Sequence, residues 1–440
     1  MSHRLRHKFN LALVALTLIG VAHVASSTVV GRNTSAESIT RGRILKFAPA
    51  ERGAWLAYLE RSERQRQADK SAFQAELKHA AIAKPTEPPH GFSTRSMPLD
   101  REAEWYANAE ALHIADDIVS FQTPAGGWGK NFDLSKGPRT PGERYAPNNA
   151  SRFLAPGDFD TPKDADWNYI GTIDNNATIT QIAFLGRVIS ATGVAKNSPY
   201  LASFLRGVRY LLAAQFPNGG WPQVWPLEGG YHDAITYNDN AMVQVMELML
   251  SIAEGRDGYA FVAAEMRSEA KAAYTRALHC VFATQLSSVG KLTVWAQQYD
   301  ALTLKPTSAR NYEMPAECSS ESDDILMMLM DDLPDPTVQQ QRAIRAAAAW
   351  FKKTAIYGQK YGPTANGRGL TLKQGVGPIW ARYYQIDTDK PIFGDRDKSI
   401  HDDLYELSSE RRNGYGWFGP EPQIALDRFE KWSQQHPESK

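Results

Sequence analysis

Apolar side chains recur every three to four residues along most of the chain, which is the spacing of amphipathic helices. This pattern predicts two helices within residues 35–83 and further helices at 102–121, 176–191, 200–214, 241–253, 266–286, 322–330 and 337–357. Strict alternation of apolar and polar positions is confined to short stretches such as 291–295. The sequence therefore predicts a mostly α fold with short strands and long loops.

One motif occurs twice at equivalent places in this pattern. The segment 122–128 reads Gln-Thr-Pro-Ala-Gly-Gly-Trp, and the segment 215–221 reads Gln-Phe-Pro-Asn-Gly-Gly-Trp. Each copy follows a predicted helix, and the paired glycines allow a sharp turn there. A repeat longer than one helix indicates helical hairpins stacked around an axis, as in an α/α toroid.

An acidic-amide cluster opens the helix that follows each copy of the motif. The clusters are Asp174-Asn175-Asn176 and Asn238-Asp239-Asn240. Asp and Asn are preferred helix N-caps, but one cap residue suffices for a helix. Carboxylate and amide oxygens are also the ligands that calcium prefers. The positive end of a helix disfavours a cation, so a metal site requires carboxylates that point towards each other. Both interpretations stay open at this point.

Three arginines, Arg310, Arg382 and Arg396, lie in irregular segments among aromatic residues. A guanidinium group matches a carboxylate bidentately, so the three together could bind an acidic ligand. Alternatively, each forms a surface ion pair of little energetic value, such as Arg310 with Glu313 or Glu317.

Two other acidic stretches match metal-binding motifs only in part. Residues 158–166 lie in a long irregular segment, 131–171, of a kind that is usually functional or disordered. They depart from the EF-hand pattern at Pro162 and Lys163, so we interpret them as a solvated or lid loop. Residues 331–335 read Asp-Asp-Leu-Pro-Asp, like the diphosphate-binding run of prenyl-transfer enzymes, but the prolines favour a turn at a helix end.

The composition and the N-terminal residues limit which binding partners and which cellular location are expected. The 49 basic and 49 acidic residues cancel, so no global basic field exists for nucleic acid or an anionic membrane. A basic start, an apolar run at 11–22 and small residues at 25–27 predict a signal peptide over 1–27, hence a secreted or periplasmic protein with no membrane span in its mature form. Cys280 and Cys318 can pair or stay free, and two thiols exclude a multi-thiolate zinc site.

Taken together, these motifs resemble the pectate lyases of polysaccharide lyase family 10. The resemblance spans about residues 100–420 and rests on the stretches 122–131, 172–187, 215–224, 236–246, 295–299, 308–315 and 382–396. It implies helical hairpins in an incomplete α/α toroid with a central groove. It also implies cleavage of polygalacturonate by calcium-assisted anti-β-elimination to 4,5-unsaturated oligogalacturonides. We expect the chain to act as a monomer. The expected division is a packing segment at 28–95 and a catalytic domain at 96–436.

The resemblance also implies roles for single residues. Arg310 corresponds to the catalytic base, although arginine is normally protonated in proteins and needs nearby positive charge to lower its proton affinity. Calcium is expected at Asp174, Asn175 and Asp239. Substrate contacts are expected from Arg382, Arg396, Lys130, Trp128 and Trp221.

Two alternatives come from other classes of protein. A helical-toroid terpene cyclase or prenyltransferase would use the Asp-Asp-Leu-Pro-Asp run, but the signal peptide argues against it because isoprenoid diphosphates are made inside the cell. A non-catalytic periplasmic sugar-binding protein would use the same aromatic residues and arginines, but it would not need an acidic cluster.

Overall fold

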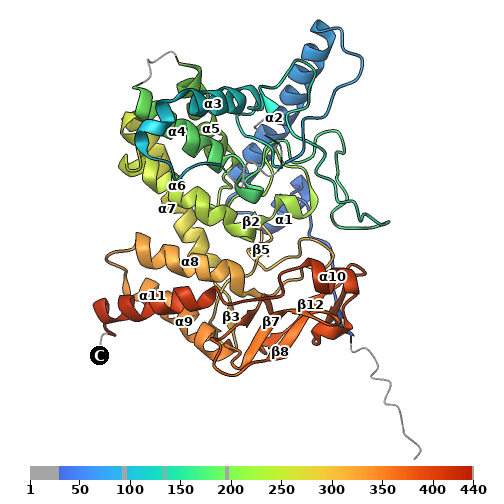
Figure 1. Ribbon diagram of the computed structural model, residues 1–440, viewed down its shortest axis with the longest axis vertical. Coiled ribbons are helices and arrows are strands. Elements are labelled where there is room, and N and C mark those ends of the chain that lie inside the picture. Colours follow the sequence, from blue (N-terminus) through green and yellow to red (C-terminus); the bar gives the residue numbers. More distant parts are fainter. Residues whose placement is uncertain (1–28, 92–96, 132, 134–135, 194–197, 439–440) are drawn as a thin grey trace, which may run out of the picture.

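The computed structural model describes residues 29–91, 97–131, 133, 136–193 and 198–438 (Figure 1). The predicted signal peptide at 1–27 lies outside these residues. Within the described part of the chain, no helix combines the length and apolarity needed to cross a bilayer.

Pairs of helices build most of the molecule, as the apolar periodicity predicted. Along the chain these helices are α3 (Ala109–Ser120), α4 (Ile179–Thr192), α5 (Pro199–Ala214), α6 (Ala241–Glu254), α7 (Ala264–Thr284), α8 (Ser319–Asp332), α9 (Val338–Thr354) and α11 (Pro422–Gln435). Among consecutive helices, α4 packs on α5 and α6 packs on α7. The helix α4 contacts α6, α6 contacts α8 and α8 contacts α11, whereas α3 contacts α5 and α5 contacts α7. The helices α4, α6, α8 and α11 therefore form one layer, and α3, α5 and α7 form another, as in an α/α toroid. The predicted mostly α fold is confirmed.

The repeated motif makes the same turn in both copies. The Gln122 side-chain amide donates to the Gly126 carbonyl at 2.7 Å, and Gln215 donates to the Gly219 carbonyl at 2.9 Å. Gly126 and Gly219 have φ values of 104° and 95°, which favour glycine. A Cβ on Gly219 would lie 2.2 Å from the Arg276 carbonyl oxygen, so a side chain cannot fit there.

Each copy of the turn ends in a tryptophan that is hydrogen-bonded to the preceding helix, and two further tryptophans make the same contact. The indole N–H donates to a helix carbonyl at 2.7–2.8 Å in four places: Trp128 to Ile118, Trp221 to Leu211, Trp295 to Val281 and Trp380 to Phe351. All four side chains are fully buried. The expectation that Trp128 and Trp221 bind substrate is therefore wrong, because their rings are core residues with satisfied N–H groups and cannot reach a sugar.

The N-terminal segment lies against these helices. It contains β1 (Val29–Arg32), α1 (Arg41–Phe47) and the long helix α2 (Arg52–His79), drawn in blue in Figure 1. Trp55 and Tyr58 of α2 pack on Phe216, with ring centroids 5.4 and 5.1 Å away, and the Tyr58 hydroxyl donates to the Ala214 carbonyl at 2.9 Å. The domain division near residue 95 stays a prediction.

Short strands gather in the C-terminal part. Sheets of three strands have the orders β1-β13-β12 and β11-β10-β6, and β7 pairs with β8 in an antiparallel hairpin that the sequence analysis did not predict. The strand bounds are β2 Ile235–Thr236, β3 Ser287–Ser288, β4 Lys291–Leu292, β5 Gln298–Tyr299, β6 Glu317–Cys318, β7 Gln359–Thr364, β8 Gly367–Leu372, β9 Trp380–Ala381, β10 Tyr383–Gln385, β11 Lys390–Pro391, β12 Phe393–Gly394, β13 Ser399–His401 and β14 Phe418–Gly419, and the short helix α10 spans Ser409–Gly414. These strands carry a second core that includes Met314, Tyr383 and Trp417.

Candidate active site

The two acidic-amide clusters form short 3₁₀ turns that contact each other just before α4 and α6. Asn175 and Asn176 have φ values of 52° and 63°, and Asp239 and Asn240 have 51° and 59°. Neither α4 nor α6 begins with a side-chain cap hydrogen bond. Capping therefore does not explain the clusters. Left-handed backbone at several non-glycine residues is the kind of strain that concentrates at functional sites.

Asp174 is the buried carboxylate of this pair of turns, with 1 % of its surface exposed. It forms an ion pair with Lys130, whose ammonium group also lies 3.6 Å from the centroid of the Tyr169 ring. Burial raises the pKa of Asp174, but Lys130 and Arg310 together lower it by more, so the pKa lies below its ordinary value. Asp174 is therefore charged at neutral pH, and Arg310 lies within its electrostatic reach.

Asp239 lies on the solvent side of the same pair of turns and is exposed. Partial desolvation by the surrounding protein raises the pKa of Asp239, the Asp174 carboxylate raises it further, and Arg382 lowers it. The result is a pKa above the ordinary value for an aspartate. The two carboxylates thus repel each other electrostatically, and a bound cation would relieve that repulsion.

The donor set fits calcium only in part. Asp174, Asp239 and Asn175 offer hard oxygen atoms, which calcium prefers, but calcium takes six to eight of them. Within the described residues, no three His, Cys, Asp or Glu side chains form a group that could hold a metal ion by themselves. A calcium ion at this position would therefore need oxygen atoms from substrate and water as well.

Arg310 lies in a tight turn that Glu313 closes. The Glu313 carboxylate accepts from the Arg310 backbone N–H at 3.0 Å and from its guanidinium at 3.2 Å, and it also accepts from the Tyr415 hydroxyl at 2.9 Å. The guanidinium lies 3.9 Å from an Asp160 carboxylate oxygen. Burial lowers the pKa of Arg310, but Glu313 and other neighbours raise it more, so the pKa lies well above its ordinary value.

Residues far away in the sequence hold the Arg310 turn in place. The Asn33 side-chain amide donates to three backbone carbonyls, those of Arg310, Asn311 and Glu313, at 3.0–3.2 Å. The Asn311 side chain donates to the Arg396 carbonyl at 2.7 Å. The N-terminal segment and the 390s loop therefore both position Arg310.

The other two arginines are held by carboxylates and aromatic rings. Arg382 pairs with the buried Glu321, and its guanidinium carbon lies 5.0 Å from the Tyr415 ring centroid. Arg396 pairs with Glu410 at 2.7 Å, and it lies 4.4 Å from the ring centroid of the exposed Phe153. Arg382 thus lies within electrostatic reach of Asp239, whereas Arg396 belongs to the loop next to Arg310.

The repeated turn explains how these side chains come together. The residue two places after each of the four buried tryptophans lies next to a group just before or at the start of α4, α6 or α8. Lys130 pairs with Asp174, Gln223 lies against Asp174 and lowers its pKa, Gln297 donates to Asn238, and Arg382 pairs with Glu321. One backbone arrangement, repeated around the toroid, therefore supplies four side chains to one site.

Sequence reasoning missed Gln223, Gln297 and Glu321 as members of this site. It named Glu313 only as a surface ion-pair partner of Arg310, and Asp160 only as part of a solvated or lid loop, whereas both lie beside Arg310 in the site. The available signal was the third and fourth copies of the turn, Trp-Ala-Gln-Gln-Tyr at 295–299 and Trp-Ala-Arg-Tyr-Tyr at 380–384. In both copies the alanine N–H donates to the tyrosine hydroxyl, at 2.6 and 3.0 Å. Aligning all four tryptophans marks the residue two places later as a site position.

A family model and solved structures of known proteins agree on one family for this chain. A family model described as pectic acid lyase matches residues 122–426. A solved family 10 polysaccharide lyase from Cellvibrio cellulosa has 30 % sequence identity and a TM-score of 0.63, with 75 % of this chain and 95 % of that chain covered.

A second solved structure is an aspartate-to-alanine variant of the same Cellvibrio lyase in complex with trigalacturonic acid. It has 29 % identity and a TM-score of 0.62, with 78 % of this chain and 99 % of that chain covered. No curated protein sequence matches the chain.

Proposed function

The chain belongs to the pectic acid lyase family and is a polysaccharide lyase, and from this premise we propose that it cleaves de-esterified pectin by calcium-assisted anti-β-elimination. Polygalacturonate is the proposed substrate, and 4,5-unsaturated oligogalacturonides are the proposed products. The Cellvibrio relative in complex with trigalacturonic acid supports this choice of substrate. The prenyltransferase alternative is contradicted by the family match, and Asp332 of its acidic run ends α8 and accepts from Tyr274 at 3.1 Å.

The observation that carries the proposal is the convergence of Arg310, Asp174 and Asp239. Arg310 is close enough to lower the pKa of both aspartates. A guanidinium beside two close carboxylates offers a cation-binding position next to a group that can contact a sugar. No serine or cysteine nucleophile is needed, because elimination forms its double bond with electrons from the substrate itself.

In the proposed reaction, Arg382 and Arg396 hold uronate carboxylates and so orient the sugar ring. When bound at Asp174, Asn175 and Asp239, calcium supplies positive charge beside the substrate carboxylate and makes the proton on the adjacent C5 easier to remove. Arg310 takes that proton. The C5–H electrons form the C4–C5 double bond, and the C4–O4 bond breaks with its electron pair leaving on O4, which is then protonated from solvent.

Arg310 must be deprotonated before it can accept a proton. Glu313 favours its charged form, as the raised pKa indicates. The base role therefore requires positive charge nearby, from Arg382 and from bound calcium, and it favours alkaline conditions. Lys130 was expected to contact substrate, but its side chain is buried against Asp174, so its proposed role is instead to hold Asp174 in its charged form.

We also propose that the protein is exported through the signal peptide predicted at 1–27 and acts outside the cytoplasm as a monomer. A polymer of plant cell walls is reached only outside the cell, which agrees with this assignment. Localisation of the full-length chain against a chain that lacks residues 1–27 tests it: retention of the full-length chain in the cytoplasm refutes the assignment.

The decisive test uses polygalacturonate with calcium and follows the ultraviolet absorbance of the unsaturated product. Wild type is expected to produce a rise that a chelator abolishes. Arg310→Ala is expected to abolish turnover and largely preserve oligogalacturonate binding, whereas Arg345→Ala, whose partners lie at the C-terminus, is expected to stay active. Near-normal rates for Arg310→Ala, or a rise that ignores the chelator, would refute the mechanism.

A further inference from the structure

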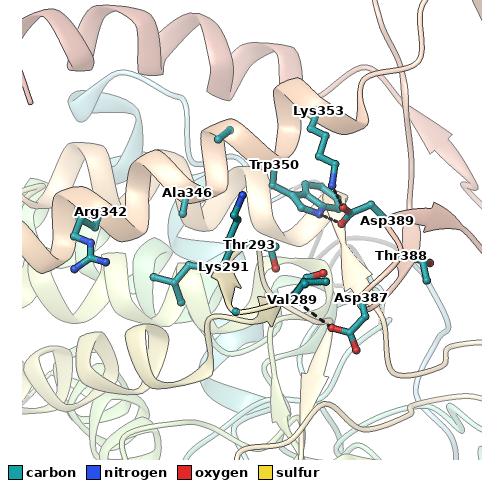
Figure 2. Close-up of a pocket in the computed structure, with 14 residues that line it drawn as sticks. Val289, Lys291, Thr293, Arg342, Ala346, Trp350, Lys353, Asp387, Thr388 and Asp389 are labelled. Carbon is teal, nitrogen blue, oxygen red and sulfur yellow. Dashed lines mark hydrogen bonds and ion pairs between the residues drawn. The ribbon is translucent and has the colours of Figure 1, made fainter.

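A cavity of about 720 Å³ lies beside α9 and shares no residue with the candidate active site. Its walls come from three segments: the β3–β4 turn, the face of α9 from Arg342 to Lys353, and the turn at residues 387–389 (Figure 2). Ligand sites in proteins typically have volumes of about 300–1,000 Å³. The cavity is therefore large enough for a small ligand or for part of a polymer chain.

Both turns at the mouth of the cavity have strained backbones. Val289 has a φ of 48°, which is rare for a β-branched residue, and Asp387 and Asp389 have φ values of 74° and 52°. The Val289 N–H donates to the Asp387 carboxylate at 3.3 Å and so connects the two turns. The shape of the mouth is thus specified by contacts across it, and such strain is more common at binding sites than elsewhere.

The charges in the cavity are uneven. At one end, Lys353 pairs with Asp389, which also accepts from the Trp350 indole N–H at 2.8 Å, and Asp387 of the same turn accepts from the Val289 N–H, so no cation among the described residues is left unpaired at this end. Figure 2 shows Arg342 at the opposite end of the cavity. Within the described part of the chain, the side chains of Lys291 and Arg342 are exposed and make no hydrogen bond or ion pair.

Apolar side chains also line this cavity. Leu292 is 40 % exposed and Val289 is 80 % exposed at the rim, and Ala346 and Ala349 line the α9 side. Sugars present apolar C–H faces and, in uronates, one carboxylate on each ring. Unpaired cations beside small apolar side chains match this combination, whereas a neutral ligand would leave both cations unused and a cationic ligand would be repelled.

We propose that this cavity is a second binding site for acidic oligosaccharide, separate from the candidate active site and resting on the proposed polygalacturonate substrate. Lys291 and Arg342 pair with uronate carboxylates, and the sugar rings pack on Leu292 and Ala346. A long polymer engages both sites on one molecule and gains effective concentration, whereas a trisaccharide is too short to do so.

The test compares Lys291→Ala/Arg342→Ala with the matched control Arg52→Ala/Lys431→Ala, which removes the same charge from exposed positions outside the cavity. KM is measured on polygalacturonate and on trigalacturonate, and retention is measured in gels that contain polygalacturonate and a chelator. Exposed ion pairs contribute little each, so the expected effect is about fivefold in polymer KM and in retention, with trigalacturonate kinetics unchanged.

Several outcomes separate the two proposals. Equal polymer KM and retention for the cavity variant and its matched control would overturn the second site and leave the lyase proposal intact. A wild type that makes no unsaturated product would refute the proposed function itself. Thermal unfolding of each variant checks that it is folded. The charge reversal Arg342→Glu is a second test of the site, because it is expected to weaken retention more than Arg342→Ala does.

Discussion

The charge of Arg310 depends mainly on one neighbour. Glu313 is 1 % exposed, and its carboxylate accepts from Arg310 and Tyr415. Burial raises the pKa of Glu313, but Arg310 lowers it more, so the pKa lies below its ordinary value and the carboxylate stays charged. Each member of this pair therefore stabilises the charged form of the other. Glu313 fixes the position of the guanidinium but makes it a weaker base.

Replacing Glu313 by Gln separates these two effects. Gln keeps similar shape and can still accept from Tyr415, but it removes the charge that raises the pKa of Arg310. If Arg310 is the base, the acidic limb of the pH–rate profile is expected to move to lower pH. A lost charge-assisted hydrogen bond is worth about 1.5–3 kcal/mol, so kcat/KM at the optimum is expected to fall roughly tenfold or more. An unmoved limb in the Gln variant would contradict the base role, and the conservative Glu313→Asp, which keeps the charge, is expected to leave the limb in place.

The buried pair of Lys130 and Asp174 makes a separate stability prediction. Removing one partner of a buried ion pair typically costs about 3–5 kcal/mol, because the other charge is left without compensation. Lys130→Met is therefore expected to lower the free energy of unfolding by that order, measured by urea denaturation at neutral pH. The double variant Lys130→Met/Asp174→Asn is expected to recover part of the loss. Additive effects of the two single changes would show that the pair does not act as a unit.

At the scale of single residues, the sequence identified the acidic groups but not their partners. Asp174 and Asp239 stood out because three polar residues in a row exceed what a helix cap needs. Gln223 and Glu321 carried no such signal, because an isolated Gln or Glu is common on any surface. Their role depends on the fold, which brings them next to Asp174 and Arg382.

The repeated turn is the element that places the site, and its tryptophans act through packing. Trp221→Phe keeps an aromatic ring but leaves the buried Leu211 carbonyl without its indole donor. The expected loss of unfolding free energy is about 1–3 kcal/mol, with KM unchanged for the folded enzyme. Thermal unfolding and kinetics on polygalacturonate measure both quantities. A raised KM at unchanged stability would instead support the sugar contact that burial argues against.

The N-terminal strand is a second element that acts on the site from a distance. Asn33 follows β1 and makes three hydrogen bonds to the Arg310 turn. Asn33→Ala is expected to loosen this turn. If Arg310 is the base, kcat is expected to fall about tenfold with a smaller effect on KM, because a misplaced base affects chemistry more than binding. The control is Arg32→Ala on the same strand, whose side chain donates to the Asp397 carbonyl instead. Equal kcat for both variants would show that the tether has no catalytic role.

At the scale of elements, helices were predictable and some strands were not. The helices of the toroid have continuous apolar faces, so periodicity located most of them within a few residues. The helix α11 was missed although Leu426, Phe429 and Trp432 follow helical spacing. The β7–β8 hairpin buries neither face consistently, so it shows no alternation for a sequence pattern to detect. The predicted helix at 102–121 instead starts at Ala109, because the Asn108 side chain caps it at the Ala111 N–H, 2.9 Å away.

For the whole molecule, the hairpin repeat could be predicted from the sequence, but the assembly of the site from distant residues could not. The motif at 122–128 and 215–221 predicted helical hairpins around an axis, and the structure has them. The site joins residues from positions 130 to 396, and contacts such as Asn33 to Arg310 cross most of the chain. Such pairings follow from how the hairpins close on each other, which no local pattern encodes.

The molecule as a whole also carries several buried carboxyl groups with raised pKa values. Burial raises the pKa of Glu228, Glu317 and Asp323 to about 8 in each case. The ordinary pKa of Glu is about 4.3, so the unfolded chain releases these protons at lower pH than the folded protein does. The stability that these groups contribute is complete below about pH 4 and is lost as pH rises through 8.

Glu228→Gln is expected to remove its share of this pH dependence, because an amide does not titrate. Urea denaturation at pH 5 and pH 9 would show a smaller fall in unfolding free energy for the variant than for wild type. The difference is expected to be on the order of 4 kcal/mol, because the folded-state pKa of about 8 lies roughly three units above pH 5 and each unit is worth about 1.36 kcal/mol. Glu430→Gln, at an exposed position on α11, is the matched control and is expected to leave the slope unchanged. If Glu228→Gln and wild type lose equal stability between the two pH values, Glu228 does not stay protonated in the folded protein. Because the proposed base favours alkaline conditions, that result would mean that the protein loses less stability at the pH of its proposed reaction than the pKa values of its buried carboxyl groups imply.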